Sequence, residues 1–156
     1  MNVVLPRNCN DATFTTAVEE SIRPFIEASQ AQAAVITCGA DALAGDPLST
    51  LSLSNGVLWN AVECVLERVA VNVVLGGGGY IPWIVAHCWS GLWAHLAGFE
   101  RPPGLPPAAR GILAALACDL VDDEDIDPRW ISTIEDRTTQ PMGRHGESRQ
   151  RLEVTM

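Results

Sequence analysis

The feature that most constrains the fold is a pair of short apolar runs, each of which ends abruptly in glycine. The first is Ala33–Cys38, "AAVITC", which stops at Gly39. The second is Val71–Leu75, which runs into four glycines within Val73–Trp83, "VVLGGGGYIPW". Both runs are rich in β-branched residues, which is typical of strands buried on both faces of a parallel sheet. A helical pattern follows each run, so the sequence predicts two consecutive strand–helix units in one sheet.

Helical patterns account for much of the remaining chain. Apolar residues recur at spacings of three and four across residues 11–28, where Pro24 is expected to kink or shorten the helix. A second helix is expected over residues 54–69, with Ser54 as its cap, and a third over residues 82–98, with a proline in its first turn. The apolar run Asn2–Leu5 predicts a short edge strand.

These elements predict one α/β domain over residues 1–136, with helices flanking a parallel sheet. The acidic run "VDDEDIDPRW" is interpreted as a solvated surface, and a short helix is expected before it. Residues 137–156 are polar and aperiodic, which predicts a mobile tail.

Charge and cysteine usage exclude several classes of protein. The net charge of −9 argues against binding to nucleic acid or to an anionic membrane. No apolar stretch approaches the roughly 18 residues of a spanning helix, and no signal peptide is recognisable. The five cysteines form no CxxC pair, so neither a metal cluster nor a disulfide framework is indicated. Buried thiols in a reducing, cytoplasmic setting are expected.

Two unusual loops follow the two strands. One contains Asp41, with Asp46 five residues on, and the other contains the glycines and Tyr80, the only tyrosine in the chain. Because parallel strands end at the same edge of a sheet, Asp41 and Tyr80 are expected to converge there. A phosphate-binding loop is disfavoured, since no Lys and Ser/Thr pair follows the glycines. Taken alone, a loop aspartate is more often a turn former or helix cap.

The motifs in combination resemble the histone deacetylase family, which has the arginase–deacetylase fold. The resemblance is carried by "GADALAGDPL" and "LGGGGY", with "NVVLPRNCNDATF" before them and "LSLSNGVLWNAV" between them. The run "YIPWIVAHCWSGLWAHLAGFERPPGLPP" is most similar to bacterial acetoin-utilisation-type deacetylases. The resemblance extends from about Asn2 to about Asp136, which is nearly the whole chain.

The resemblance implies a zinc-dependent hydrolase that acts on acetyl-lysine or a related N-acetyl amine. Such enzymes hold Zn²⁺ with two aspartates and one histidine and leave a position open for water and substrate. By motif position, Asp41 corresponds to the second zinc aspartate, and Tyr80 to the tyrosine that donates a hydrogen bond to the developing oxyanion. Gly78, Gly79 and Leu48 correspond to residues that line the acyl channel.

The sequence also departs from the family pattern. It contains neither the Asp-x-His motif that supplies the other zinc ligands nor the paired histidines of the general base. Ile81 stands where the family usually has asparagine, and His87 where related sequences often carry arginine. We therefore expect the C-terminal part of a deacetylase, inactive alone and with an apolar strand edge exposed. Alternatives are a partner chain that completes a split deacetylase and a non-catalytic module that binds a small ligand.

Overall fold

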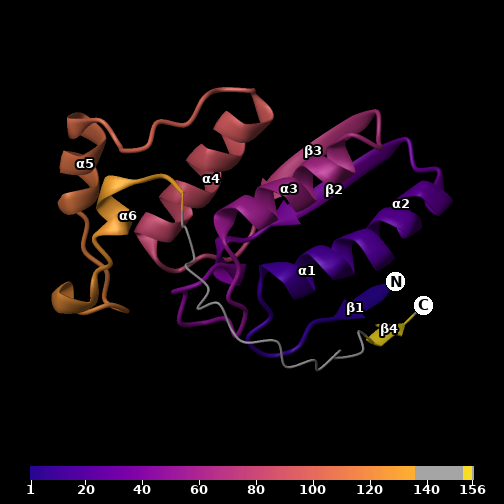
Figure 1. Ribbon diagram of the computed structural model, residues 1–156, viewed down its shortest axis with the longest axis horizontal. Helices are drawn as coiled ribbons and strands as arrows, with labels where there is room; N and C mark the ends of the chain where they lie inside the picture. The colour runs from indigo at the N-terminus through magenta and orange to yellow at the C-terminus, as the bar shows by residue number, and fades with distance from the viewer. Residues whose placement is uncertain (136–152, 156) are drawn as a thin grey trace.

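The computed structural model describes residues 1–135 and 153–155 and has an α/β architecture (Figure 1). Its central sheet consists of two parallel strands, β2 (Ala33–Cys38) and β3 (Val71–Gly76). They pair in register from Ala33 opposite Val71 to Cys38 opposite Gly76. The expected fold class, both strands and their parallel arrangement are confirmed.

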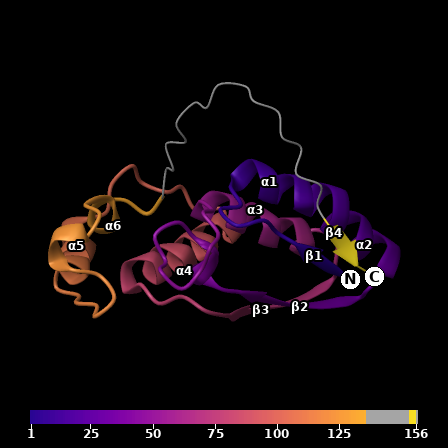
Figure 2. The ribbon, with the colours of Figure 1, turned by 90° about the horizontal axis from the view of Figure 1, so that it is seen from below.

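The helices gather on one side of this sheet (Figure 2). Helix α3 (Asn55–Leu66) connects β2 to β3 and packs on β2, and α1 (Asp11–Ala17) and α4 (Pro82–Leu96) pack against α3. The Ser54 hydroxyl accepts a hydrogen bond from the Val57 amide at 3.3 Å, which caps α3 as expected. No helix in the described part of the chain is both long and apolar enough to cross a membrane.

The expected break at Pro24 takes the form of a widened helical turn. Between α1 and α2 (Arg23–Ser29) lies a π-helical segment, η1 (Val18–Ile22). The Arg23 amide donates to the carbonyl of Val18, five residues back. Pro24 has no amide hydrogen to donate, and it falls in the first turn of α2, where none is needed.

The other face of the sheet corrects one expectation from the sequence. Neither strand is buried on both faces, because exposure alternates along each of them. Ile36 and Val74 pack against the helices, whereas Val35, Val71 and Val73 are exposed on the opposite face. In the described residues no helix lies over that face. The strands have the apolar composition of a sheet covered on both faces, but this sheet is covered on one face only.

The core lies between α3, α4 and the ends of the strands. Trp59 of α3 is buried, and its indole Nε1 donates to the carbonyl of Cys88 in α4 at 2.9 Å. Trp83 is buried as well, donating to the carbonyl of Leu113 at 2.8 Å and stacking on Trp130. These contacts attach α5 (Pro107–Ala114) and α6 (Arg129–Ser132) to α4. A 3₁₀ turn, η3 (Asp123–Asp125), lies within the acidic run.

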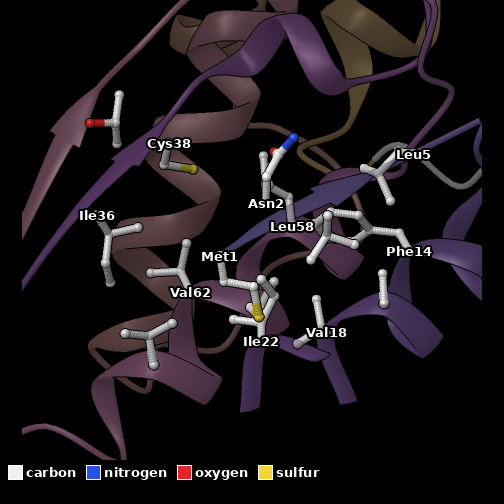
Figure 3. A pocket seen from close by; sticks show the side chains of 15 residues that line it. Met1, Asn2, Leu5, Phe14, Val18, Ile22, Ile36, Cys38, Leu58 and Val62 are labelled. Carbon is white, nitrogen blue, oxygen red and sulfur yellow. The ribbon is translucent and has the colours of Figure 1, made fainter. Parts of the chain in front are cut away.

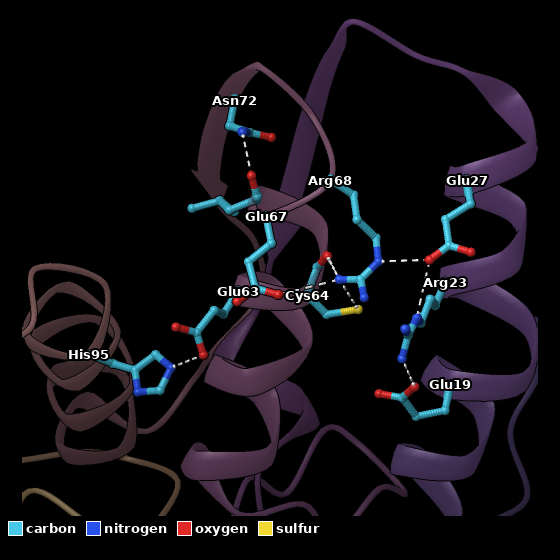
Figure 4. Close-up of polar contacts among 10 residues, drawn as sticks. Glu19, Arg23, Glu27, Glu63, Cys64, Glu67, Arg68, Asn72 and His95 are labelled. Atoms are coloured by element: carbon cyan, nitrogen blue, oxygen red, sulfur yellow. Dashed lines mark hydrogen bonds and ion pairs between the residues drawn. The ribbon is translucent and has the colours of Figure 1, made fainter.

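Exposed ion pairs fix α2 against α3 (Figure 4). Arg23 lies between Glu19 and Glu27, at 2.8 and 3.2 Å, and Arg68 reaches Glu27 at 3.2 Å. Arg23 and then Arg68 hold the pKa of the Glu27 carboxyl below its ordinary value by hydrogen bonding to it. Because Glu19, Arg23 and Glu27 are exposed and screened by salt, these ion pairs orient the helices more than they stabilise them.

A second, separate pair of strands joins the two ends of the described chain. β1 (Asn2–Val4) pairs antiparallel with β4 (Glu153–Thr155), so the expected edge strand is present. The remainder of the expected mobile tail, residues 137–152 and 156, lies outside the described residues.

An apolar cavity of about 430 Å³ separates β1 from the sheet (Figure 3). It is lined by side chains of β1, α1, β2 and α3, among them Phe14, Ile36 and Val62. Strand β1 is therefore held beside α1 rather than hydrogen-bonded to β2.

Candidate functional site

The two unusual loops meet where β2 and β3 end. The amide of Ala40, just after β2, donates to the carbonyl of Gly78, just after β3, at 2.7 Å. The first loop folds back on itself through a bridge between Leu43 and Leu53, both fully buried. The expected convergence at one edge of the sheet is therefore present, with both loops held by backbone contacts.

The carboxylate of Asp41 lies directly against the glycine run. Asp41 belongs to a 3₁₀ turn, η2 (Ala40–Ala42), which follows Gly39. A Cβ atom placed on Gly78 would lie 2.1 Å from Asp41 Oδ2, and one placed on Gly39 would lie 2.4 Å from Oδ1. Since real Cβ atoms do not approach other atoms so closely, glycine at these positions is what makes room for the carboxylate.

Gly79 is required for a second reason. Its φ of +140° is a backbone conformation that other residues rarely adopt. A Cβ there would also lie 2.8 Å from Val85 Cγ2 and 2.9 Å from Ala40 Cβ. The glycine run thus packs closely against the first loop, and Tyr80 follows it directly in the chain.

Tyr80 and Leu48 lie on the rim of the two loops. Tyr80 is 47% exposed and Leu48 is 62% exposed, so packing alone leaves much of each side chain open to solvent. The Tyr80 carbonyl accepts a long contact, 3.7 Å, from the thiol of Cys118. Tyr80 directly follows the glycine run, and Leu48 is linked to Tyr80 through Asp46. The catalytic role of Tyr80 and the channel-lining role of Leu48 remain predictions.

Asp46 is a buried polar residue of this region that makes one local and one long-range hydrogen bond. It is 5% exposed, and its two oxygens bind different loops. Oδ1 accepts from the amide of Leu48 at 3.0 Å, and Oδ2 accepts from the amide of Tyr80 at 2.8 Å. The Asp-Pro-Leu sequence was a signal for the first, local contact. Nothing in the local sequence indicates the second, which spans 34 positions.

The two departures from the family pattern are both buried. Ile81 is fully buried at the start of α4, so the chain after Tyr80 is anchored by packing rather than by a polar side chain. His87 is also buried, on the inner side of α4. His95, the other histidine of this helix, contacts Glu63 at 2.8 Å, away from the two loops.

The described residues do not by themselves provide a complete set of metal ligands. Among residues 1–135 and 153–155, no three His, Cys, Asp or Glu side chains lie together as a ligand set. Asp41 fits the position of one oxygen ligand, because its carboxylate sits at the loop edge and is only partly buried. Catalytic zinc sites use three protein ligands, so the others would have to come from residues beyond those described.

Comparison with known proteins identifies the relatives of this chain. The model of the histone deacetylase domain matches residues 1–96. Histone deacetylase 6 of Arabidopsis thaliana is 36% identical over 109 residues, which is 68% of this chain and 22% of that protein. Histone deacetylase RPD3 of Saccharomyces cerevisiae is 37% identical over 89 residues, 57% of this chain and 21% of that protein. The chain thus spans about a fifth of the length of these relatives.

Solved structures show the same relationship. A crystal structure of an HDAC homolog complexed with SAHA superimposes with a TM-score of 0.78 and 32% sequence identity, covering 96% of this chain and 39% of that one. An HDAC homolog from Aquifex aeolicus gives a TM-score of 0.77 and 33% identity, covering 87% of this chain and 37% of that one. Nearly all of this fold therefore corresponds to less than half of theirs.

Proposed function

Because this chain belongs to the histone deacetylase family, we propose that it forms the C-terminal part of a zinc-dependent deacetylase of the acetoin-utilisation type. The substrate is acetyl-lysine or a related N-acetyl amine, from which acetate is released. The observation that carries this proposal is the Asp41 carboxylate packed against Gly78, in the same glycine run that ends in Tyr80. The proposal assigns the metal-side carboxylate to Asp41 and the hydroxyl donor to Tyr80, with the glycine run between them. The packing of Asp41 against Gly78 supports this assignment.

Each of the proposed site residues has a distinct role in the reaction. Zinc, once bound in the complete site, would polarise the acyl carbonyl and lower the pKa of a bound water. Asp41 contributes one carboxylate to the metal side, and the Tyr80 hydroxyl donates a hydrogen bond to the acyl oxygen as negative charge develops on it. Gly78 and Gly79 present backbone without side chains to the acyl channel, and Leu48 contributes a side chain to its lining.

The isolated 156-residue chain is expected to hydrolyse nothing. One carboxylate does not retain zinc, and the sequence has no Asp-x-His or His-His to complete the site. The test incubates the purified chain with zinc and an acetyl-lysine reporter, alone and with the N-terminal part of a related deacetylase. Activity only in the combination supports the proposal, and Tyr80→Phe should then remove most of it.

Two other results would redirect the proposal. Stoichiometric zinc binding and turnover by the isolated chain would contradict its inactivity. Tight binding of a small ligand in the absence of zinc, with no activity in any combination, would favour the non-catalytic binding module instead.

The exposed sheet face supports a second part of the proposal, namely what completes the site. Val35, Val71, Val73 and Leu75 form a continuous apolar face on β2 and β3 that nothing in the described residues covers. Since nearly the whole fold matches only 39% of a solved homologue, the occupant we propose is the remainder of the deacetylase fold, in the same or a separate polypeptide.

A single charged substitution on this face should affect both the self-association of the isolated chain and its joining to the N-terminal part. Val35→Lys is expected to reduce self-association of the isolated chain, because an exposed apolar sheet attracts other sheets, and to weaken joining to the N-terminal part. Ile112→Lys is the matched control, since Ile112 is 67% exposed on α5 and Val35 is 68% exposed. Sedimentation velocity and recovery of activity measure the two effects. Equal effects of both variants would show that this face is not the joining surface.

A further inference from the structure

A single buried carboxylate connects Leu48, which is expected to line the acyl channel, with Tyr80, which is expected to donate to the oxyanion. Asp46 directs one oxygen to the Leu48 amide and the other to the Tyr80 amide, at 3.0 and 2.8 Å. A hydrogen bond to an ionised acceptor is stronger than a neutral one, and a bidentate acceptor fixes geometry as well. The distance between the two backbones is thereby set by one side chain.

This connection matters because packing restrains the side chains of these two residues only in part. Leu48 and Tyr80 are both largely exposed at the rim, so packing fixes their side chains only in part. Tyr80 also follows a glycine run, and glycine has the most freely rotating backbone of any residue. The hydrogen bond from the Tyr80 amide to Asp46 therefore fixes the backbone directly after that run and supports the phenol.

Resting on the proposed function, we infer that Asp46 is the positioning residue of the acyl site. It acts through the backbone of Tyr80 and Leu48 and sets the width of the channel between them. On the far side of Tyr80, the fully buried Ile81 completes the anchor. The Tyr80 phenol is therefore held in place by the Asp46 carboxylate, which binds the Tyr80 amide, and by the buried side chain of Ile81. Together these two contacts compensate for the absence of asparagine at position 81.

The sole tyrosine makes this inference testable without activity. Labelling with 3-fluorotyrosine gives one ¹⁹F resonance, and labelling with ¹⁵N-tyrosine gives one amide signal, both from Tyr80. Asp46→Asn keeps the size of the side chain but replaces one acceptor oxygen with a donor that opposes an amide. We expect amide exchange at Tyr80 to become about tenfold faster, and the ¹⁹F resonance to shift toward that of the free amino acid.

Asp11→Ala is the matched control. Asp11 also accepts a hydrogen bond from a distant backbone amide, that of Ser54, at 2.7 Å, so its loss removes a comparable contact away from Tyr80. The control should leave both Tyr80 signals unchanged. An unchanged Tyr80 in folded Asp46→Asn, or an equal change in Asp11→Ala, would overturn the inference.

The unsubstituted chain provides a readout if Asp46→Asn does not fold. In the full chain the Tyr80 amide should exchange at least about tenfold more slowly than in an unstructured peptide. Exchange at the unprotected rate would refute the anchor. Neither measurement depends on hydrolysis. The inference about Asp46 can therefore be confirmed even if the proposed function is wrong, and it can be refuted even if the chain is active.

Discussion

Gly91→Ala is expected to be among the most destabilising single changes in the chain, although alanine is the better helix former. Gly91 lies in the middle of α4, where a Cβ would lie 2.0 Å from Cζ2 and 2.3 Å from Cη2 of Trp59. That indole is buried and donates to Cys88, so it cannot move aside without losing a hydrogen bond. Overpacking and the strained hydrogen bond together should lower the free energy of unfolding by about 2–4 kcal/mol. Urea unfolding followed by circular dichroism measures this.

A control and a rescue distinguish the clash from helix propensity. Gly111→Ala in α5 introduces a Cβ with nothing within 4 Å, so it should stabilise by about 0.5–1 kcal/mol. Trp59→Phe makes room beside position 91, and in that background Gly91→Ala should do less harm than in the original chain. Additive effects of the two changes would mean that the contact between Trp59 and Gly91 is not the cause.

Gly78→Ala should have its largest effect on chemistry and little on folding. The added Cβ would occupy the position of Asp41 Oδ2, and the partly exposed carboxylate can rotate away from it. Displacing a reacting group by about 1 Å can reduce turnover about 100-fold. In the combination of this chain with the N-terminal part, kcat/KM should therefore fall about 100-fold, while the unfolding midpoint of the isolated chain changes little. Steady-state kinetics and thermal unfolding give the two values.

Gly76→Ala is the companion to this experiment. It lies two residues earlier, and its Cβ would make an ordinary contact of 3.5 Å with Trp89. Activity within about threefold of the original is expected, since no site group is displaced. If Gly76→Ala and Gly78→Ala reduced activity equally, the whole run would be sensitive to added side chains, and the specific contact with Asp41 would not explain the loss.

The sequence predicted local structure well where one segment determines it. Strand β2 was placed at its observed bounds, because a β-branched run between turn residues leaves few alternatives. Ser54 and Pro24 correctly marked a helix cap and a helix interruption. The meeting of the two loops at one edge of the sheet followed from the rule that parallel strands end at the same edge.

Features that depend on distant partners were not accessible in this way. The prediction that both strands are buried on both faces was wrong, because the composition of a strand shows what it can pack against and not what lies beside it in a given chain. The bond from Asp46 to Tyr80 and the contact of Gly91 with Trp59 join residues that have no common local pattern. Strand β4 fell in a polar, aperiodic segment whose pairing is set by β1 alone.

The pairing of β1 with β4 has a consequence for the order in which the chain folds. β2, α3 and β3 are consecutive, so their contacts close short loops, whereas β1 and β4 come from opposite ends of the chain. Closing the longer loop costs more conformational entropy, and only three residue pairs form between the two strands to offset this cost. We therefore expect this pair to form last and to open first. In native-state hydrogen exchange, the amides of β1 should exchange well before those of β2.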